Sequence, residues 1–280
     1  MAASQPRDLR VLHDDGLCLV VDKPGGLLTQ APPDIDSVEL RLKEWFRDQN
    51  PDAKQIYCGV PHRLDRPATG AMLFSRNATG TKHLGEQFRN RSVTKLYWTI
   101  VGGEVSEPAG SWTDYMRKVP GQPRSEIVAS DHPDAQLAML RYRCLASSSL
   151  GSLLEIQLET GRTHQIRLQA SSRCLPILGD ELYGSTHSFG PPSFDKRARW
   201  IALHARQLNF DHPTLRRRFR IVAPLFAHWA PFLEQFDVQQ FTASQVDDLQ
   251  AGGPFLDPLG NEVSPPSPPT SSDPTQKKEK

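Results

Sequence analysis

Short apolar runs that end in turn-forming residues recur along the chain. Residues 17–21 precede an Asp-Lys-Pro-Gly-Gly turn, and residues 71–74 follow a turn that contains Pro67 and Gly70. Runs of this kind predict buried strands. Further strand-like patterns occupy residues 93–101, 137–145, 153–158, 203–212 and 220–224.

Helical periodicity separates several of these runs. Apolar residues at positions 38, 42, 45 and 46 share one helical face, and Asp36 and Ser37 can cap a helix that starts at Val38. Residues 77–89 have an amphipathic helical pattern, Thr163 is expected to cap a helix through Ala170, and residues 226–233 predict a closing helix. Short strands and helices in alternation favour an α/β or α+β fold.

The composition changes after about residue 245. Residues 251–280 hold seven prolines and many Ser, Thr and Asp residues, too few apolar groups to form a core. We therefore expect an N-terminal arm over residues 1–10, one folded domain over 11–240, and a disordered Pro/Ser-rich tail over 246–280. Residues 108–133 are polar and rich in turn formers, which predicts an irregular insertion or a short hairpin.

Composition places the chain among globular proteins, with 38% apolar and 23% charged residues over 280 positions. It has no apolar run of about 18 residues, and its start lacks an apolar signal region, so we expect a cytoplasmic protein without a membrane span. The four cysteines are far apart and lack paired-ligand spacing, which argues against a zinc site or a disulfide framework.

Charge is unevenly distributed along the chain. The net charge is +1, but residues 1–234 carry 30 basic and 25 acidic residues (+5), whereas residues 235–280 carry 3 and 7 (−4). Eight Lys and Arg residues lie between positions 196 and 220, with Asp211 as the only acid. From charge alone, a stripe that attracts a phosphate backbone and an ordinary solvated face are equally good interpretations.

A carboxylate lies among basic groups in the segment Pro-His-Arg-Leu-Asp-Arg-Pro, residues 61–67. Asp65 is preceded by His62 and Arg63, followed by Arg66, and placed on a loop that leads into a predicted strand. Neighbouring positive charges favour the ionised form, and an ionised, positioned carboxylate is a possible nucleophile or general base. A surface loop with a salt bridge is the alternative interpretation.

Two further segments carry polar groups at predicted strand and helix positions. Alternation along residues 93–101 places Lys95 and Tyr97 on one face of a strand. In Thr-Gly-Arg-Thr-His-Gln-Ile-Arg, residues 160–167, His164 and Arg167 are three apart and share a helical face. A basic face at the start of a helix suits a phosphate or a carboxylate.

Taken in order, the His-Arg-Leu-Asp segment with its Thr-Gly turn, the Lys-x-Tyr strand, the Thr-Gly-Arg-Thr-His-Gln-Ile-Arg segment and a Gly-Asp-x-x-Tyr-Gly turn at 179–184 resemble the motifs of the RluA-type RNA pseudouridine synthases. The resemblance spans roughly Leu17 to Pro224. It implies an α+β pseudouridine synthase fold: a mixed, largely antiparallel sheet with flanking helices and a central active-site cleft. It also implies that residues 11–240 are the catalytic domain of a short form without an N-terminal S4-like RNA-binding domain.

The resemblance further implies the isomerisation of uridine to pseudouridine in RNA, without a cofactor or a metal. In this interpretation Asp65 acts on the ribose, Tyr97 stacks on the uracil, and Arg167 pairs with Asp65 and orients it. Arg63 helps to fill the gap left by the flipped nucleotide. The other residues expected to contact RNA are His62, Lys95, Arg162 and His164. The expected partner is a loop-containing rRNA or tRNA, and we expect the protein to be a monomer.

One position departs from the family pattern, which commonly has Thr-Ser-Gly where this chain has Ala68-Thr69-Gly70. The change concerns the loop beside Asp65. Two alternatives stay open. One is a non-catalytic RNA-binding or chaperone protein of the same fold, against which the presence of Asp65, Tyr97 and Arg167 argues. The other is a metal-dependent hydrolase built from His62, Asp65, His164 and His204, which EDTA would inhibit.

Overall fold

The computed structural model describes residues 6–236. The predicted tail over 246–280 lies outside this range, as does half of the predicted arm over 1–10. One ten-stranded sheet organises the described chain. Its strands are β1 Arg10–Asp14, β2 Cys18–Lys23, β3 Thr69–Ser75, β4 Thr94–Val101, β5 Ala109–Lys118, β6 Ser125–Ile127, β7 Gln136–Ser148, β8 Gly151–Leu158, β9 Leu203–Asp211 and β10 Arg218–Val222.

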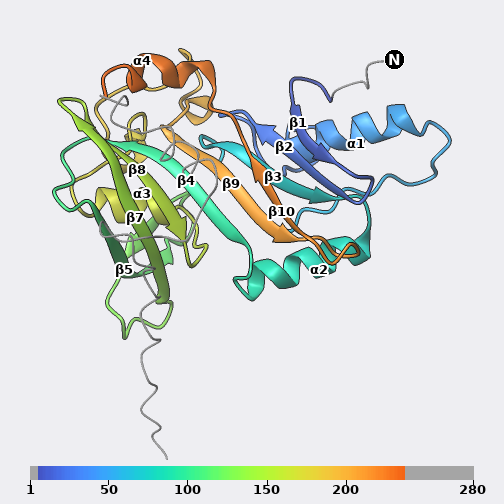
Figure 1. Cartoon of the computed structure of the whole chain (residues 1–280), viewed down its shortest axis with the longest axis horizontal. Helices are drawn as coiled ribbons and strands as arrows, with labels where there is room; N and C mark the ends of the chain where they lie inside the picture. The colour runs from blue at the N-terminus through green and yellow to red at the C-terminus, as the bar shows by residue number, and fades with distance from the viewer. Residues whose placement is uncertain (1–5, 237–280) are drawn as a thin grey trace, which may run out of the picture.

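The helices are few and flank the sheet. They are α1 Val38–Gln49, α2 Ala78–Arg89, α3 Gln165–Ser171 and α4 Ala230–Leu233, with 3-10 turns η1 Glu181–Tyr183, η2 Lys196–Ala198 and η3 Ala227–Trp229. Figure 1 shows β4 and β9 running through the middle of the sheet, with β1–β3, α1 and α2 to one side and β5, β7, β8 and α3 to the other. Within the described range, none of the helices has the length and apolar character that a membrane span needs.

The strand order is β1-β2-β3-β9-β4-β8-β7-β5-β6, and β10 pairs with β9. Among the described strands, the parallel pairing is that of β3 with β9, where Thr69 lies opposite His204 and Gly70 opposite Ala205. Gly70 has a φ of +111°, and a Cβ there would lie 2.4 Å from the Ala205 carbonyl oxygen. A glycine is therefore required where the Asp65 loop enters the sheet. The mixed, largely antiparallel sheet agrees with the predicted fold class.

Two helices cover opposite faces of the sheet. Ser37 caps α1, as predicted, because its side chain accepts a hydrogen bond from the Leu40 amide. The buried face of α1 belongs to the cluster that contains Leu19 and Phe74. Leu84 of α2 belongs to a second cluster on the other face, formed by the alternate residues of the same strands. The sheet between these two packed clusters therefore holds the loops that connect its strands.

The structure corrects one local expectation and refines another. Thr163 does not cap the third helix: α3 begins at Gln165, and the capping position is His164, which has a φ of 57° and makes no capping hydrogen bond through its side chain. Of the two alternatives for residues 108–133, the hairpin is confirmed, because β5 pairs with β6, but it is not a separate insertion, since β5 continues the main sheet beside β7. Ten residues of β5 thus extend the sheet, which the polar composition concealed.

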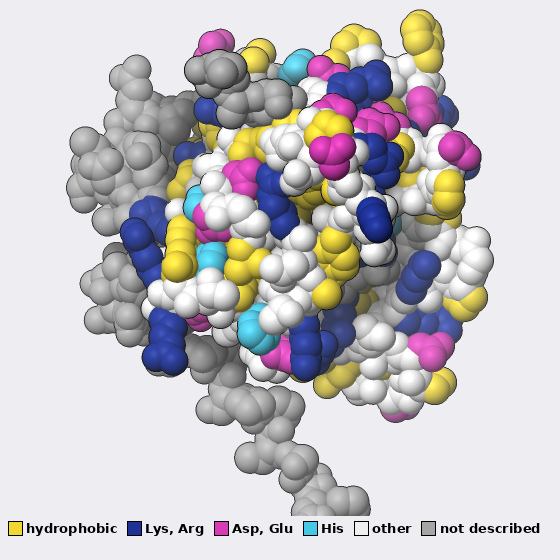
Figure 2. Space-filling model, turned by 90° about the vertical axis from the view of Figure 1, so that its right-hand side faces the viewer, with side chains coloured by type: hydrophobic (Ala, Val, Ile, Leu, Met, Phe, Trp, Pro, Cys, Tyr) yellow, Lys and Arg dark blue, Asp and Glu magenta, His cyan; other side chains and the backbone are white. Residues whose placement is uncertain are grey.

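The basic residues between 196 and 220 do not form one stripe. Lys196, Arg197 and Arg199 line one cavity, whereas Arg206 and Arg220 line another. Arg216 to Arg218 lie at the turn between β9 and β10 and at the start of β10. On the face shown in Figure 2, Lys and Arg side chains are scattered among acidic and apolar ones. The basic residues at the two cavities and at the β9–β10 turn are therefore three separate sets.

Candidate active site

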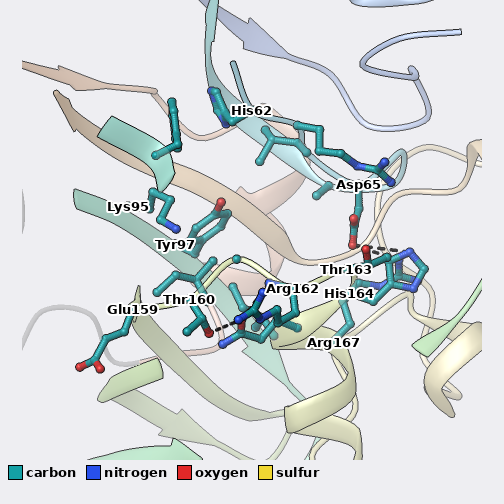
Figure 3. Close-up of a pocket in the computed structure, with 18 of the residues that line it drawn as sticks. His62, Asp65, Lys95, Tyr97, Glu159, Thr160, Arg162, Thr163, His164 and Arg167 are labelled. Carbon is teal, nitrogen blue, oxygen red and sulfur yellow. Dashed lines mark hydrogen bonds and ion pairs between the residues drawn. The ribbon is translucent and has the colours of Figure 1, made fainter. Parts of the chain in front are cut away.

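A cavity of about 640 Å³ brings together side chains from several parts of the chain (Figure 3). It is bounded by the segment before β3, by β4, and by the loop that joins β8 to α3. The structure brings all the predicted site residues to its walls: His62, Arg63, Asp65, Lys95, Tyr97, Arg162, His164 and Arg167. These residues come from three parts of the sequence that are far apart, so the sheet is what assembles them.

The backbone around Asp65 is held from both sides. Thr29 binds Leu64 twice: its hydroxyl donates to the Leu64 carbonyl at 3.0 Å and accepts from the Leu64 amide at 3.2 Å. On the other side, Nζ of Lys23 donates to the carbonyls of Arg66 and Ala68 at 3.1 and 2.8 Å. Asp65 itself keeps a side chain that is 18% exposed. A fixed backbone therefore presents a carboxylate that a substrate can still reach.

Lys23 is fully buried, and burial lowers its pKa to about 7 even though the nearby charge of Asp65 acts in the opposite direction.

The surroundings of Ala68 explain its departure from the family pattern. The Ala68 methyl group is buried in the core, and the neighbouring Thr69 hydroxyl lies 2.8 Å from Nδ1 of His204. Thr69 thus supplies the hydroxyl contact in this loop, and Ala68 fills apolar space.

Arg167 connects Asp65 to a second carboxylate. Its Nη1 donates to Oδ2 of Asp65 at 3.2 Å, while Nε and Nη2 donate to the two oxygens of Asp180 at 2.6 and 2.8 Å. Burial works against the guanidinium charge, but the hydrogen bonds to Asp180 and the charges of both carboxylates outweigh it and raise the pKa of Arg167. The guanidinium therefore stays charged and cannot turn freely.

His164 faces Asp65 from the other side of Arg167. Its Nδ1 lies 2.9 Å from the hydroxyl of Tyr183, and its Nε2 lies 3.9 Å from Oδ2 of Asp65. The Tyr183 hydroxyl accepts from the Ser125 amide at 2.9 Å, and it also lies 3.5 Å from the Ser125 carbonyl oxygen, a second acceptor for its proton. Nε2 is thus the ring nitrogen of His164 that faces Asp65. Burial is the main cause that lowers the pKa of His164.

Tyr97 and Lys95 lie across the cavity from these residues (Figure 3). In the pairing of β4 with β9 the register shifts between Leu96 and Tyr97, where β9 carries the extra residue Arg206, while the pairing of β4 with β8 stays regular. Burial and the charge of Asp65 raise the pKa of Tyr97, so its hydroxyl stays protonated. Burial, followed by the charge of Arg91, lowers the pKa of Lys95 to about 8. An aromatic ring thus faces the carboxylate of Asp65, with an ammonium group beside it.

His62 and Arg162 line the cavity but are largely engaged by the protein. Nε2 of His62 accepts a hydrogen bond from the Leu73 amide at 2.9 Å, and the ring stacks on Phe88 with centroids 4.4 Å apart. Burial lowers the pKa of His62 to about 3. A role for His62 as a cation toward RNA phosphates is inconsistent with this environment. Arg162 uses its Nε to bind the Leu137 carbonyl at 3.0 Å.

The ligand set of a metal-dependent hydrolase does not converge in the structure. His62 is used as described above, and His204 binds Thr69 and the Ala223 carbonyl through its two ring nitrogens. Among the described residues, the potential ligand atoms of Asp15, Cys18 and His212 do lie within 4.8 Å of one another. In that group the Nδ1 of His212 accepts from the Leu215 amide at 3.1 Å, which leaves the ring proton on Nε2, 2.9 Å from Asp15.

Two residues that hold the site were not recognised as such from the sequence. Asp180 binds Arg167, and its place in the Gly-Asp-x-x-Tyr-Gly motif was the available signal. Thr29 carries no local signal, because it lies in a loop and acts through the backbone of a residue 35 positions away. Such long-range contacts become visible only in the folded chain.

Comparisons with known proteins agree with this geometry. A family model described as RNA pseudouridylate synthase matches residues 18–172. Ribosomal large subunit pseudouridine synthase D of Xanthomonas campestris is 34% identical over 233 residues, which are 80% of this chain and 68% of that protein. tRNA pseudouridine synthase C of Haemophilus ducreyi is 31% identical over 242 residues, 82% of this chain and 96% of that protein.

A solved structure gives the same result for the fold. Human RNA pseudouridylate synthase domain containing 4 superposes with a TM-score of 0.66 at 25% identity, covering 82% of this chain and 93% of that one. The predicted pseudouridine synthase fold is therefore confirmed. Together, the motifs, the cavity around Asp65 and these matches show that the chain belongs to the RluA-type family of RNA pseudouridine synthases, which are isomerases.

Proposed function

We propose that this protein isomerises specific uridines in loops of ribosomal or transfer RNA to pseudouridine, with Asp65 as the catalytic carboxylate. The observation that carries the proposal is the placement of Asp65: it is partly exposed in a cavity, held by Arg167 at 3.2 Å, and faced by Tyr97. The relatives that act on ribosomal and on transfer RNA by name support both substrate classes equally.

In the proposed reaction the bond between N1 of the uracil and C1′ of the ribose breaks, the base turns, and C5 bonds to C1′. The proton on C5 is lost and N1 gains one, so the change is an isomerisation that needs no cofactor. Asp65 either attacks C1′ or removes a proton from the sugar. Arg167, fixed by Asp180, holds the carboxylate in place for either step.

The remaining residues supply binding. The Tyr97 ring stacks on the uracil, a role that suits a buried ring whose hydroxyl stays protonated. Arg63 is exposed at the cavity wall and fills the space that the flipped nucleotide leaves in the RNA. The bound RNA strand passes along the cavity wall formed by Lys95, Arg162 and His164. Flipping costs least in a loop, which is why we propose a loop as the target.

We also propose that residues 11–240 act as the catalytic domain, as a monomer, in the cytoplasm. What supports a monomer is that Asp65, Tyr97 and Arg167 all come from one chain. What supports the location is that the bacterial relatives are named for ribosomal and transfer RNA. Light scattering behind a sizing column would measure the mass of the protein in solution.

The experiment uses total RNA from a source strain that lacks the gene. The RNA is incubated with the wild-type protein or with Asp65→Asn, and pseudouridine is mapped by carbodiimide labelling and primer extension. We expect a new stop with the wild type alone, which also identifies the target. If both proteins bind RNA equally and neither creates a stop, the chain is a non-catalytic RNA-binding member of its family.

A further inference from the structure

A second cavity, of about 850 Å³, meets the first at the catalytic carboxylate. The two cavities share the residues that surround it, namely Arg63, Leu64, Asp65, His164 and Arg167. Tyr97 and Lys95 line the first cavity only. The groove therefore continues past Asp65, beyond the space that the target uridine occupies under the proposed function.

The far wall of the second cavity includes the loop between η1 and β9. Asp195 anchors this loop to the segment that carries the catalytic residue, because its Oδ2 accepts from Nη2 of Arg66 at 3.1 Å. Oδ1 of the same carboxylate caps η2 by accepting from the Arg197 amide at 2.9 Å. The loop is thus tied to the residue that follows Asp65 and keeps a defined position beside the groove.

Two cations of this loop are available to a ligand. Arg199 is paired with Glu181, and Arg66 is paired with Asp195. Lys196 and Arg197 are exposed at the wall of the cavity, and within residues 6–236 neither forms an ion pair. Both are therefore free to bind phosphate groups.

An aromatic ring lies next to these cations in the sequence. Phe194 has a relative exposure of 108%, so no part of its ring is covered by the protein. For comparison, the next most exposed large apolar side chain in the described range, Leu215, has 59%. Phe194 is not one of the residues that line the second cavity, but it precedes Asp195, which is tied to Arg66 of that cavity, and Leu182, which is 46% exposed, adds apolar surface to the cavity itself. Surfaces that bind single-stranded RNA combine exposed aromatic rings, which stack on bases, with cations that bind the phosphate backbone. Phe194 with Lys196 and Arg197 has this combination.

We infer that Phe194, Lys196 and Arg197 form a second nucleotide-binding subsite, which takes a nucleotide next to the target uridine. Phe194 stacks on its base, and Lys196 and Arg197 bind the backbone phosphates. The order of the two nucleotides along the groove rests on the proposed function. The binding of single-stranded RNA by these three residues does not depend on catalysis.

The first test measures binding of a fluorescein-labelled oligouridine of 12 nucleotides to the full chain by fluorescence anisotropy. Phe194→Ala removes one stacking platform and is expected to weaken binding roughly 5- to 100-fold. Leu215→Ala is the matched control, since it also removes an exposed apolar side chain beside arginines, but at the turn between β9 and β10. It is expected to bind as the wild type does. Because both side chains are exposed, neither change should lower the melting temperature.

The second test measures how the dissociation constant depends on salt. The double variant Lys196→Ala with Arg197→Ala removes two phosphate contacts, so the slope of log Kd against log salt should fall by about 1.4. Arg216→Ala with Arg217→Ala makes the same change in net charge at the β9–β10 turn and should leave the slope unchanged. Equal effects of the two double variants would mean that only overall charge matters, and the subsite would be rejected.

The outcome separates this inference from the proposed function. If the wild type modifies RNA but Phe194→Ala binds oligouridine as tightly as the wild type, the subsite is wrong and the catalytic proposal stands. If no protein forms pseudouridine but Phe194→Ala and the Lys196 and Arg197 variant lose affinity selectively, the subsite stands and the catalytic proposal is wrong.

Discussion

Arg167 binds Asp180 more closely than it binds Asp65. Two hydrogen bonds of 2.6 and 2.8 Å fix its guanidinium on Asp180, and a single bond of 3.2 Å reaches the proposed catalytic carboxylate. The side chains of Arg167 and Asp180 are 5% and 2% exposed, whereas Asp65 is 18% exposed. Asp180 therefore aims the arginine, and the arginine positions Asp65 without occupying its whole carboxylate.

This arrangement predicts that Asp180→Asn impairs both folding and activity. Removing one charge of a buried pair leaves Arg167 without its main partner, and we expect a loss of roughly 3–5 kcal/mol in the free energy of unfolding. Activity should fall about 100-fold, because the guanidinium can then shift toward Asp65. Urea denaturation and pseudouridine formation at a permissive temperature measure the two effects.

Asp65→Asn serves as the control for that experiment. Arg167 keeps both bonds to Asp180 in this variant, so stability should change by less than about 1 kcal/mol while activity is lost. If Asp180→Asn were as stable as Asp65→Asn, the buried pair would not be what holds Arg167.

Because the side chain of Lys23 is buried, we expect its titration to make the stability of the protein depend on pH. Folding lowers the pKa of this group to about 7, so between pH 7 and the ordinary lysine value the unfolded chain binds more protons than the folded one. Stability contributed by this group therefore rises with pH across that window, by roughly 2 kcal/mol between pH 7 and pH 9. Lys23→Met should lack this rise, which urea denaturation at the two pH values would reveal.

The same substitution should also loosen the Asp65 loop, because the carbonyls of Arg66 and Ala68 lose their donor. Catalytic rate should fall more than RNA affinity. Lys82→Met, at an exposed position of α2, is the control. A pH response that is identical in wild type and Lys23→Met would assign it to other groups.

Local patterns predicted the elements of this fold better than their connections. The apolar runs before Lys23 and after Gly70 became β2 and β3, because burial of a strand leaves its mark on consecutive residues. The parallel contact of β3 with β9 joins residues 135 positions apart, and no local pattern records it. The helix start near His164 was misplaced because Thr163 is a good capping residue, whereas the helix begins after His164, which has a φ of 57° and contacts Tyr183 through its ring.

The site shows the same division. Asp65 could be singled out because its basic neighbours are adjacent in the sequence. Its contact with Arg167 spans 102 positions and was expected only from the resemblance. The distribution of basic residues could not be predicted, since the eight between positions 196 and 220 separate onto two cavities and a turn. Folding thus converted one apparent stripe into separate surfaces.

The titration of Lys95 leads us to expect that RNA affinity depends on pH. Its pKa is lowered to about 8, so the side chain is charged below that value and neutral above it. If it binds a phosphate, affinity should fall roughly fivefold to tenfold between pH 7 and pH 9. Lys95→Arg stays charged throughout this range and should respond much less. Filter binding in an Asp65→Asn background, which prevents turnover, measures both.

Arg91 provides an independent check of that assignment. Its charge is the second cause that lowers the pKa of Lys95, after burial, so Arg91→Ser should move the loss of affinity to higher pH. A curve that keeps its midpoint in Arg91→Ser, or that is the same in Lys95→Arg as in the wild type, would show that another group titrates.

The buried carboxyl of Asp22 leads us to expect a pH dependence of stability whose sign is opposite to that expected for Lys23. Its side chain is 4% exposed, its Oδ1 has no hydrogen-bond partner in the described residues, and burial raises its pKa to about 7 despite Arg10 and Arg206. The folded chain therefore binds more protons than the unfolded chain between about pH 4 and pH 7, and stability falls as pH rises through this window.

The variant Asp22→Asn removes this titrating charge. Relative to the wild type, it should gain roughly 2–3 kcal/mol in the free energy of unfolding between pH 5 and pH 8. Urea denaturation at both values measures the gain, and Asp52→Asn, at an exposed turn, should show none. A gap between wild type and Asp22→Asn that is constant with pH would mean that the buried carboxyl does not titrate in this range.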